Sequence, residues 1–222
     1  VNTVEEHIIT IEDPVERQLE GIVQGHVNER AGMTFAAALR SMLRQDPDVI
    51  MVGEMRDRET ADLAIRAALT GHLVFSTLHT NSAAASYTRL VDMGCDPFLL
   101  TTTIRAILAQ RLIRKLCYKC KVKYRPTEKD LKSLGVEKLD GFIYHANSNG
   151  CKTCGKDGYK GRAGIYELLI PNEAINEAVK NEASAEEVNR IASDNKMKTL
   201  QQAALTYVVR GDTSVEEISR VL

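Results

Sequence analysis

Four of the five cysteines in this 222-residue chain stand in two Cys-x-x-Cys pairs. Cys117 and Cys120 form the first pair, Cys151 and Cys154 the second, and 30 residues separate the pairs. Four thiolates arranged in two knuckles are a typical ligand set for tetrahedral Zn²⁺. Free or redox-active thiols are the alternative, which is disfavoured because two pairs occur and neither follows a strand as in thioredoxin. The fifth cysteine, Cys95, is predicted to be a small packing residue.

A second group of chemically useful side chains follows three short apolar segments, 7–11, 49–52 and 72–78. These polar side chains are Glu12, Asp13 and Glu16 after the first segment, Glu54 and Arg56 after the second, and His79 after the third. The carboxyl ends of parallel strands meet at one edge of a sheet, which is where α/β proteins bind ligands. Carboxylates, an arginine and a histidine there would suit a divalent cation and a phosphate chain. Any one such carboxylate is more often a solvated turn residue, so the combination carries the prediction.

Helical patterns separate these apolar segments. Apolar residues at helical spacing predict helices over 34–44, with Thr34 as N-cap, and over 58–69, 82–93 and 98–116. Strands that alternate with helices indicate an α/β fold with a mostly parallel sheet.

The pattern changes after Cys117, since no long apolar period occurs up to Arg162. An apolar run over 165–170 follows, and then three or four short helices, one of them capped by Ser184. We therefore expect three parts: an α/β portion over 1–116, a zinc subdomain over 117–160 and a small helical C-terminal subdomain over 161–222.

Composition excludes two broad classes of protein. Lysine and arginine total 29 against 30 aspartates and glutamates, so the chain is not a generally basic nucleic-acid binder. No apolar run approaches the ~18–20 residues of a membrane-spanning helix. Hydrophobic residues make up 44% of the chain and charged residues 27%, which is ordinary for a globular protein.

One local basic run departs from this balance. Residues 105–125 carry eight positive charges and no acidic residue: Arg105, Arg111, Arg114, Lys115, Lys119, Lys121, Lys123 and Arg125. A solvated face, an acidic protein partner, an anionic membrane surface and nucleic acid are the four interpretations.

Four segments in a fixed order resemble the motifs of the secretion ATPase superfamily. Residues 11–16 (IEDPVE) resemble its Asp box, 43–57 (LRQDPDVIMVGEMRD) its Walker B region and 70–81 (TGHLVFSTLHTN) its His box. The cysteine pairs together with 158–169 (GYKGRAGIYELL) resemble the zinc-bearing branch, which holds the type II secretion and type IV pilus assembly ATPases.

This resemblance implies a RecA-like P-loop ATPase core, present in part, and roles for six residues. The catalytic residues would be Glu16, Glu54 and His79, and the nucleotide and Mg²⁺ pocket would include Glu12, Asp13 and Arg56. Glu54 matches the Walker B glutamate that supports Mg²⁺, and His79 matches a sensor of the γ-phosphate. Glu16 and Glu54 are both candidates for the general base.

The resemblance also implies a hexameric motor that hydrolyses ATP with Mg²⁺ to power type II secretion or type IV pilus assembly. Its partners would be ATP, further copies of itself and inner-membrane platform proteins, with no nucleic acid. It would lie in the cytoplasm, peripherally on the inner face of the bacterial cytoplasmic membrane. Secretion, pilus and competence systems share these motifs, so the resemblance does not choose among them.

One departure from the family pattern concerns the Walker A loop, Gly-x-x-x-x-Gly-Lys-Ser/Thr, which cradles phosphates. The nearest match, residues 150–157 (GCKTCGKD), ends in aspartate and contains two predicted metal ligands. We therefore expect this chain to be the C-terminal part of such an ATPase, inactive alone. The alternative is a zinc-ribbon module that binds nucleic acid or protein on an inactive α/β scaffold.

Overall fold

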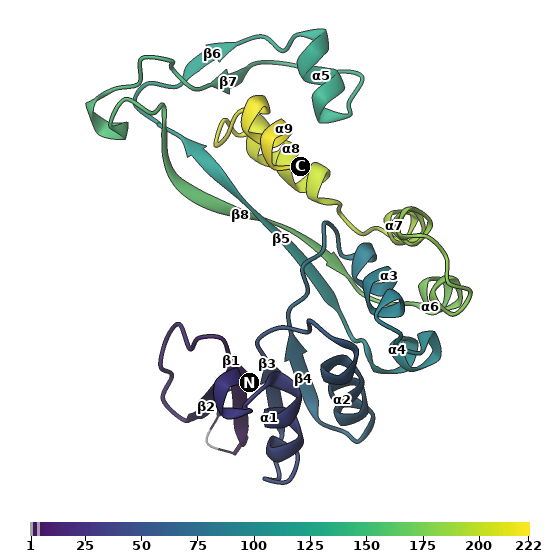
Figure 1. The fold of residues 1–222 in the computed structure, drawn as a ribbon. Helices are drawn as coiled ribbons and strands as arrows, with labels where there is room; N and C mark the ends of the chain where they lie inside the picture. Colours follow the sequence, from purple (N-terminus) through teal and green to yellow (C-terminus); the bar gives the residue numbers. More distant parts are fainter. Residues whose placement is uncertain (1, 4) are drawn as a thin grey trace. The chain divides into compact units, whose positions relative to one another are not determined.

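The computed structural model describes residues 2–3 and 5–222. Two compact units make up the chain, one formed by residues 1–105 and 171–191, the other by 106–170 and 192–222 (Figure 1). These boundaries differ from the three consecutive parts 1–116, 117–160 and 161–222 that we expected. The cause is the pairing of two strands far apart in sequence, described below, which places 106–116 and 159–170 in the same unit.

A four-stranded parallel sheet forms the centre of the first unit (Figure 1). Its strands are β1 (Ile8–Glu12), β2 (Ile22–His26), β3 (Val49–Val52) and β4 (Leu73–Ser76), in the order β2-β1-β3-β4. All three pairings are parallel, which confirms the predicted sheet. The sequence analysis missed β2.

Two helices pack against this sheet and against each other: α1 (Phe35–Met42) and α2 (Arg58–Leu69). Leu39 of α1 and Ile50 of β3 are fully buried in the shared core. Thr34 caps α1 by accepting a hydrogen bond from the Ala37 N–H, as predicted, and Asp57 caps α2. The caps therefore set where both helices begin through local interactions, and the apolar faces hold the helices against the sheet.

The remaining regular elements of the first unit are helices. They are η1 (Glu29–Ala31), α3 (Ala84–Asp92), α4 (Pro97–Thr103), α6 (Glu173–Lys180) and most of α7 (Ala185–Asp194). The chain returns to this unit because α6 packs against α4. Ser184 accepts a hydrogen bond from the Glu187 N–H at the start of α7, which confirms the predicted cap.

The predicted helix over 98–116 is wrong beyond Thr103. Residues Ile107–Leu116 form strand β5, which pairs antiparallel with β8 (Tyr159–Leu169). In β5, Ala109 and Ile113 are buried while Leu108 and Leu112 are half exposed, and the apolar residues on both faces imitate helical spacing. A partner strand distant in sequence decided the conformation, and local periodicity does not reveal such a partner.

The second unit combines this β5–β8 ribbon with a small hairpin and helices. The hairpin is β6 (Val122–Tyr124) paired with β7 (Ile143–His145). The helices are α5 (Glu128–Leu134), η2 (Lys152–Cys154), α8 (Leu200–Val209) and α9 (Val215–Val221). The sequence analysis missed β6, β7 and α5, whereas the expected series of short C-terminal helices, α6 to α9, is present.

A buried carboxylate joins α9 to β5. The Glu217 side chain, in a residue only 1% exposed, accepts hydrogen bonds from the Arg114 backbone N–H and guanidinium and from the Arg220 guanidinium. Burial alone would raise the pKa of Glu217, but the two arginines outweigh it and lower this pKa to about 2.

We expect the protein to lose stability as the pH falls from about 4.5 towards 2, because unfolded glutamate binds a proton before the folded Glu217 does. The contribution is on the order of 3 kcal/mol, fully present above the pKa of the unfolded side chain. Urea unfolding from pH 2.5 to 7 measures it. The Glu217→Gln variant should show a flatter dependence, and an unchanged slope would contradict the assignment.

Within the described part of the chain, no helix is both long and apolar enough to cross a membrane.

Candidate functional site

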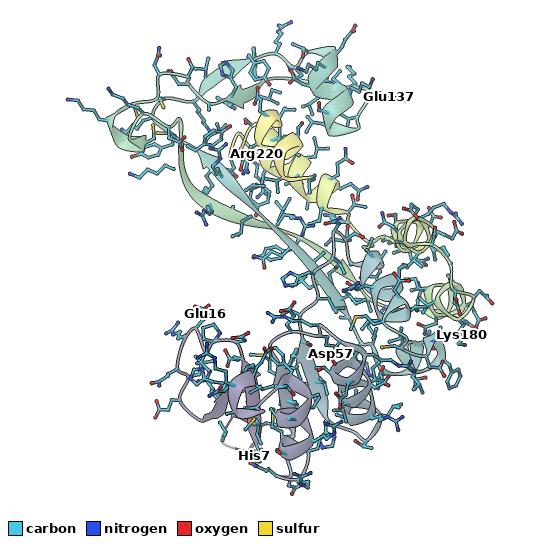
Figure 2. The ribbon with its side chains drawn as sticks, viewed as in Figure 1. His7, Glu16, Asp57, Glu137, Lys180 and Arg220 are labelled. Atoms are coloured by element: carbon cyan, nitrogen blue, oxygen red, sulfur yellow. The ribbon has the colours of Figure 1, made fainter. Side chains whose placement is uncertain are left out.

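The ends of β1, β3 and β4 are hydrogen-bonded to one another at the carboxyl edge of the sheet. The Gly53 N–H donates to the Ile11 carbonyl at 2.8 Å, and the Thr77 hydroxyl donates to the Gly53 carbonyl at 2.6 Å. The Met55 N–H donates to the Thr77 carbonyl. Figure 2 shows Glu16 and Asp57 towards the end of the sheet opposite His7, which precedes β1. The three strand ends therefore converge as predicted.

Glu54 is the centre of a charged network at this edge. Its Oε1 lies 2.8 Å from His79 Nε2, and its Oε2 accepts a hydrogen bond from Arg56 Nε at 2.6 Å. The Arg56 guanidinium also lies 3.7 Å from the Asp13 carboxylate. The hydrogen bond and the charge of Glu54 raise the pKa of Arg56 further. Four of the six predicted residues thus meet in one network.

Exposure differs sharply within the network. The Glu54 side chain is 15% exposed, whereas the His79 side chain is 87% exposed. The carboxylate is therefore largely buried, while the His79 imidazole and the Arg56 guanidinium face solvent, and the guanidinium can donate further hydrogen bonds to a bound anion. Gly53 keeps this arrangement tight, since an added Cβ would lie 3.1 Å from the Ile11 carbonyl oxygen and 3.3 Å from Glu12 Cα.

The other two predicted residues stand apart from the network. Glu12 Oε1 accepts hydrogen bonds from the Thr10 hydroxyl and from Gln24 Nε2, which direct it towards β2. Glu16 lies exposed in the loop between β1 and β2, and it makes no hydrogen bond or ion pair with any described residue. The structure therefore brings Glu54, Arg56, His79 and Asp13 together in one network. Glu12 and Glu16 lie outside that network.

Sequence reasoning missed Thr77, which links the β3 and β4 ends through its hydroxyl and its carbonyl. Its position directly after β4, on the same edge as Glu54, was a signal that could have found it.

The four predicted metal ligands form a cluster in the second unit. All four sulfur atoms lie within 4.8 Å of one another. Cys117 and Cys151 are 3.7 Å apart, Cys120 and Cys154 3.8 Å, and Cys151 and Cys154 3.7 Å. A tetrahedral ion with metal–sulfur distances of about 2.3 Å requires sulfur–sulfur separations of about 3.8 Å. The cluster therefore fits Zn²⁺.

Backbone N–H groups support this cluster. The Cys151 and Gly158 N–H groups both point at Cys154 Sγ, at 3.2 and 3.3 Å. Although burial raises the pKa of Cys154, these hydrogen bonds lower it to about 6, whereas burial and the neighbouring cysteines raise the pKa of Cys120 to about 12. An all-sulfur donor set selects soft or borderline ions over Mg²⁺ and Ca²⁺.

The segment that resembles a Walker A loop, 150–157, belongs to this cluster. It contains η2 and both cysteines of the second pair, and the element after it is strand β8, whereas a helix follows a Walker A loop. The conformation of this segment places Cys151 and Cys154 in the sulfur cluster, so the segment does not form a phosphate-binding loop.

Gly150 allows this segment to turn. It has φ +54°, and an added Cβ would lie 2.3 Å from the Lys156 carbonyl carbon. We expect Gly150→Ala to weaken zinc binding at least ~10-fold, because it displaces the second knuckle. Gly155→Ala is the matched control, since Gly155 has φ +64° but an added Cβ there meets no atom within 4 Å. Competition with a chromophoric chelator measures both affinities, and equal losses would contradict this explanation.

The basic run over 105–125 is not one uniform surface. The Arg114 guanidinium binds the buried Glu217, and Lys121 Nζ donates to the Gly211 carbonyl at 2.7 Å. Lys123 lies over the Phe142 ring. At least three of the eight charges therefore have structural partners inside the second unit.

Comparison with known proteins places these sites in a family. The family model described as "Type II/IV secretion system protein" matches residues 1–220. The type II secretion system protein E of Pseudomonas aeruginosa is 49% identical over 215 residues, which is 97% of this chain and 42% of that protein. The type IV pilus assembly ATPase PilB of Thermus thermophilus is 47% identical over 221 residues, 98% of this chain and 25% of that protein.

A solved structure shares the fold. The crystal structure of the pilus retraction motor PilT with bound ADP superposes with a TM-score of 0.67 at 33% identity, over 96% of this chain and 51% of that one. The chain thus spans less than half the length of the two curated relatives above. The resemblance drawn from the motifs is confirmed: the chain belongs to the type II/IV secretion system protein family, in the group of the secretion protein E and PilB ATPases.

Proposed function

We propose that this chain supplies the acidic wall of a Mg²⁺–ATP site in a motor that powers type II secretion or type IV pilus assembly. The observation that carries the proposal is the Glu54 carboxylate, held between Arg56 and His79 at the carboxyl edge of a parallel sheet. The names of the relatives, a pilus assembly ATPase and an ADP-bound motor, support the same chemistry. The sheet would then be part of a RecA-like core.

Each residue of the network has a definite task in this proposal. Mg²⁺, when bound, would screen the phosphate charge, and Glu54 would hold it through water. Arg56 is an exposed donor that would bind phosphate oxygens, and the exposed His79, whose Nε2 lies on Glu54, would sense the γ-phosphate as the family resemblance implies. Asp13 lies beside Arg56 and would keep its guanidinium over the pocket.

The general base is either Glu54 or Glu16. Both carboxylate oxygens of Glu54 already have a partner, one in Arg56 Nε and the other in His79 Nε2. Glu16 is free of such partners among the described residues and lies on the loop that leaves the same edge. We therefore assign Glu54 to the cation and Glu16 to the attacking water.

A phosphate cradle must come from outside this set of residues. The sequence contains no Gly-x-x-x-x-Gly-Lys-Ser/Thr segment, and its nearest match belongs to the cysteine cluster. Residues 1–222 by themselves would therefore bind ATP weakly and hydrolyse it very slowly.

The cysteine cluster would hold one structural Zn²⁺ through Cys117, Cys120, Cys151 and Cys154. The sulfur separations and the absence of carboxylates among these ligands support Zn²⁺. The ion would fix the junction of the two cysteine pairs and would take no part in hydrolysis.

Assembly and location complete the proposal. We propose a homo-hexamer that acts on inner-membrane platform proteins from the cytoplasmic face, as the secretion and pilus relatives suggest. Hydrolysis at a ring interface would let one nucleotide bias the positions of two subunits.

A direct assay tests the proposed activity. A protein that contains this chain together with a Gly-x-x-x-x-Gly-Lys-Ser/Thr loop should release phosphate from Mg²⁺–ATP, whereas residues 1–222 alone should not do so appreciably. A longer protein that neither binds nor hydrolyses ATP would refute the motor, and equal activity in residues 1–222 would refute the missing cradle.

A further inference from the structure

The turn between α8 and α9, residues 211–214, touches both strands from which the cysteine pairs emerge. The Leu116 N–H donates to the Asp212 carbonyl at 2.8 Å, and the Thr213 hydroxyl donates to the Arg114 carbonyl at 2.8 Å. The Tyr159 hydroxyl lies 2.8 Å from Ser214 Oγ. Thr213 and Ser214 are fully buried in these contacts. The turn therefore fixes the end of β5 and the start of β8.

The end of β5 and the start of β8 lie next to the cysteine cluster in the sequence. Leu116 directly precedes Cys117, and Leu116 pairs with Tyr159 in the ribbon. Gly158, next to Tyr159, donates its N–H to Cys154 Sγ, and its carbonyl accepts the Cys117 N–H at 2.9 Å. A shift of either strand end would therefore move both the Cys117 and the Cys154 sulfur atoms.

A third link leaves the first cysteine pair directly. Lys121, which follows Cys120, donates from Nζ to the Gly211 carbonyl at 2.7 Å. Gly211, the first residue of the turn, is therefore hydrogen-bonded to the residue that directly follows the first cysteine pair.

Glu217 on α9 also binds the end of β5, next to the turn. Its carboxylate binds the Arg114 backbone N–H and guanidinium, and that guanidinium also lies over the Tyr159 ring and 3.8 Å from Asp157. Arg114 thus connects α9 with the segment that carries the second cysteine pair.

We propose that residues 211–217 are a positioning element of the metal cluster, so that Zn²⁺ binding and the docking of α9 stabilise each other. This inference rests on the Zn²⁺ site proposed above. Thermodynamic linkage makes such coupling reciprocal: if the docked helix holds the sulfurs in binding geometry, bound Zn²⁺ must stabilise the docked helix.

Hydrogen exchange on the whole chain tests one direction of the coupling. Removal of Zn²⁺ with a strong chelator should speed amide exchange in α9 and in 211–214 at least ~10-fold, while exchange in α2 stays unchanged. Adding Zn²⁺ alone should restore the protection. Unchanged protection of α9 after complete removal of the metal would overturn the coupling.

Zn²⁺ affinity tests the other direction. Glu217→Gln should bind Zn²⁺ at least ~10-fold more weakly in chelator competition, because Glu217 holds the Arg114 backbone near the strand end that leads into Cys117, and coupling energies between sites are typically of this size. Glu187→Gln is the matched control, because Glu187 also binds an arginine three residues later, Arg190, but is exposed on α7. Equal affinities of the two variants would overturn the proposal.

A milder variant covers the case in which Glu217→Gln does not fold. Tyr159→Phe removes only the hydroxyl that contacts Ser214 and keeps the ring under Arg114. It should weaken Zn²⁺ binding several-fold and speed exchange in 211–214, and wild-type values of both would contradict the positioning role. A wild-type chain that binds no Zn²⁺ would instead refute the metal site itself.

Discussion

Replacing Glu54 by glutamine should reduce ATP turnover by at least about 100-fold in a protein that carries this chain and a phosphate-binding loop. Glutamine keeps the size of the side chain but removes the charge that faces Arg56 and would support Mg²⁺. ATP should still bind, because the loop that cradles its phosphates and the pocket for its adenine ring lie elsewhere. Phosphate release and nucleotide titration measure the two properties separately.

Glu59→Gln is the matched control for this prediction. Glu59 lies in the first turn of α2, close in sequence to Glu54, and its exposed carboxylate pairs with Arg40 outside the network. It should keep wild-type turnover. Normal turnover in Glu54→Gln would refute the role of Glu54, and Glu16→Gln separates the two candidate bases, since it should retain Mg²⁺ binding but hydrolyse ATP slowly.

Loss of the metal is expected to produce the largest structural effect. Structural Zn²⁺ sites contribute apparent binding energies of about 10–16 kcal/mol, and that energy is coupled to local folding. After exhaustive dialysis the wild-type chain should retain about one Zn²⁺, and Cys151→Ser should retain much less. Residues near 117–160 should then become protease-sensitive first, because metal binding there is coupled to local folding.

Cys95→Ser is the control for the loss of any cysteine. Cys95 is buried in the first unit, outside the cluster, and burial raises the pKa of its thiol. This variant should keep its Zn²⁺ even if it is less stable. A metal-free wild-type chain, or equal Zn²⁺ content in both variants, would contradict the assignment of the ligands.

The sequence predicted the elements of the first unit that depend on local signals. Apolar segments became β1, β3 and β4, and the N-cap and apolar face of α1 appeared as expected. The converging strand ends followed from the parallel topology alone, which places successive carboxyl ends at one edge. That topology is why Glu54, His79, Arg56 and Asp13 could be grouped in advance.

Only the tertiary structure decided how the parts of the second unit pair. Residues 107–116 carry a helical spacing of apolar residues, yet they form a strand because β8, some 50 residues later, offers a complementary edge. Arg114 belongs to a basic run in the sequence, but its partner Glu217 lies 103 residues away. Likewise, the spacing within each cysteine pair indicated metal ligands, while only the folded chain brings the turn at 211–214 into contact with Leu116, directly before the first pair. Local sequence fixes backbone preferences and caps through neighbouring atoms, whereas distant pairings depend on a complementary surface that exists only after the chain has folded.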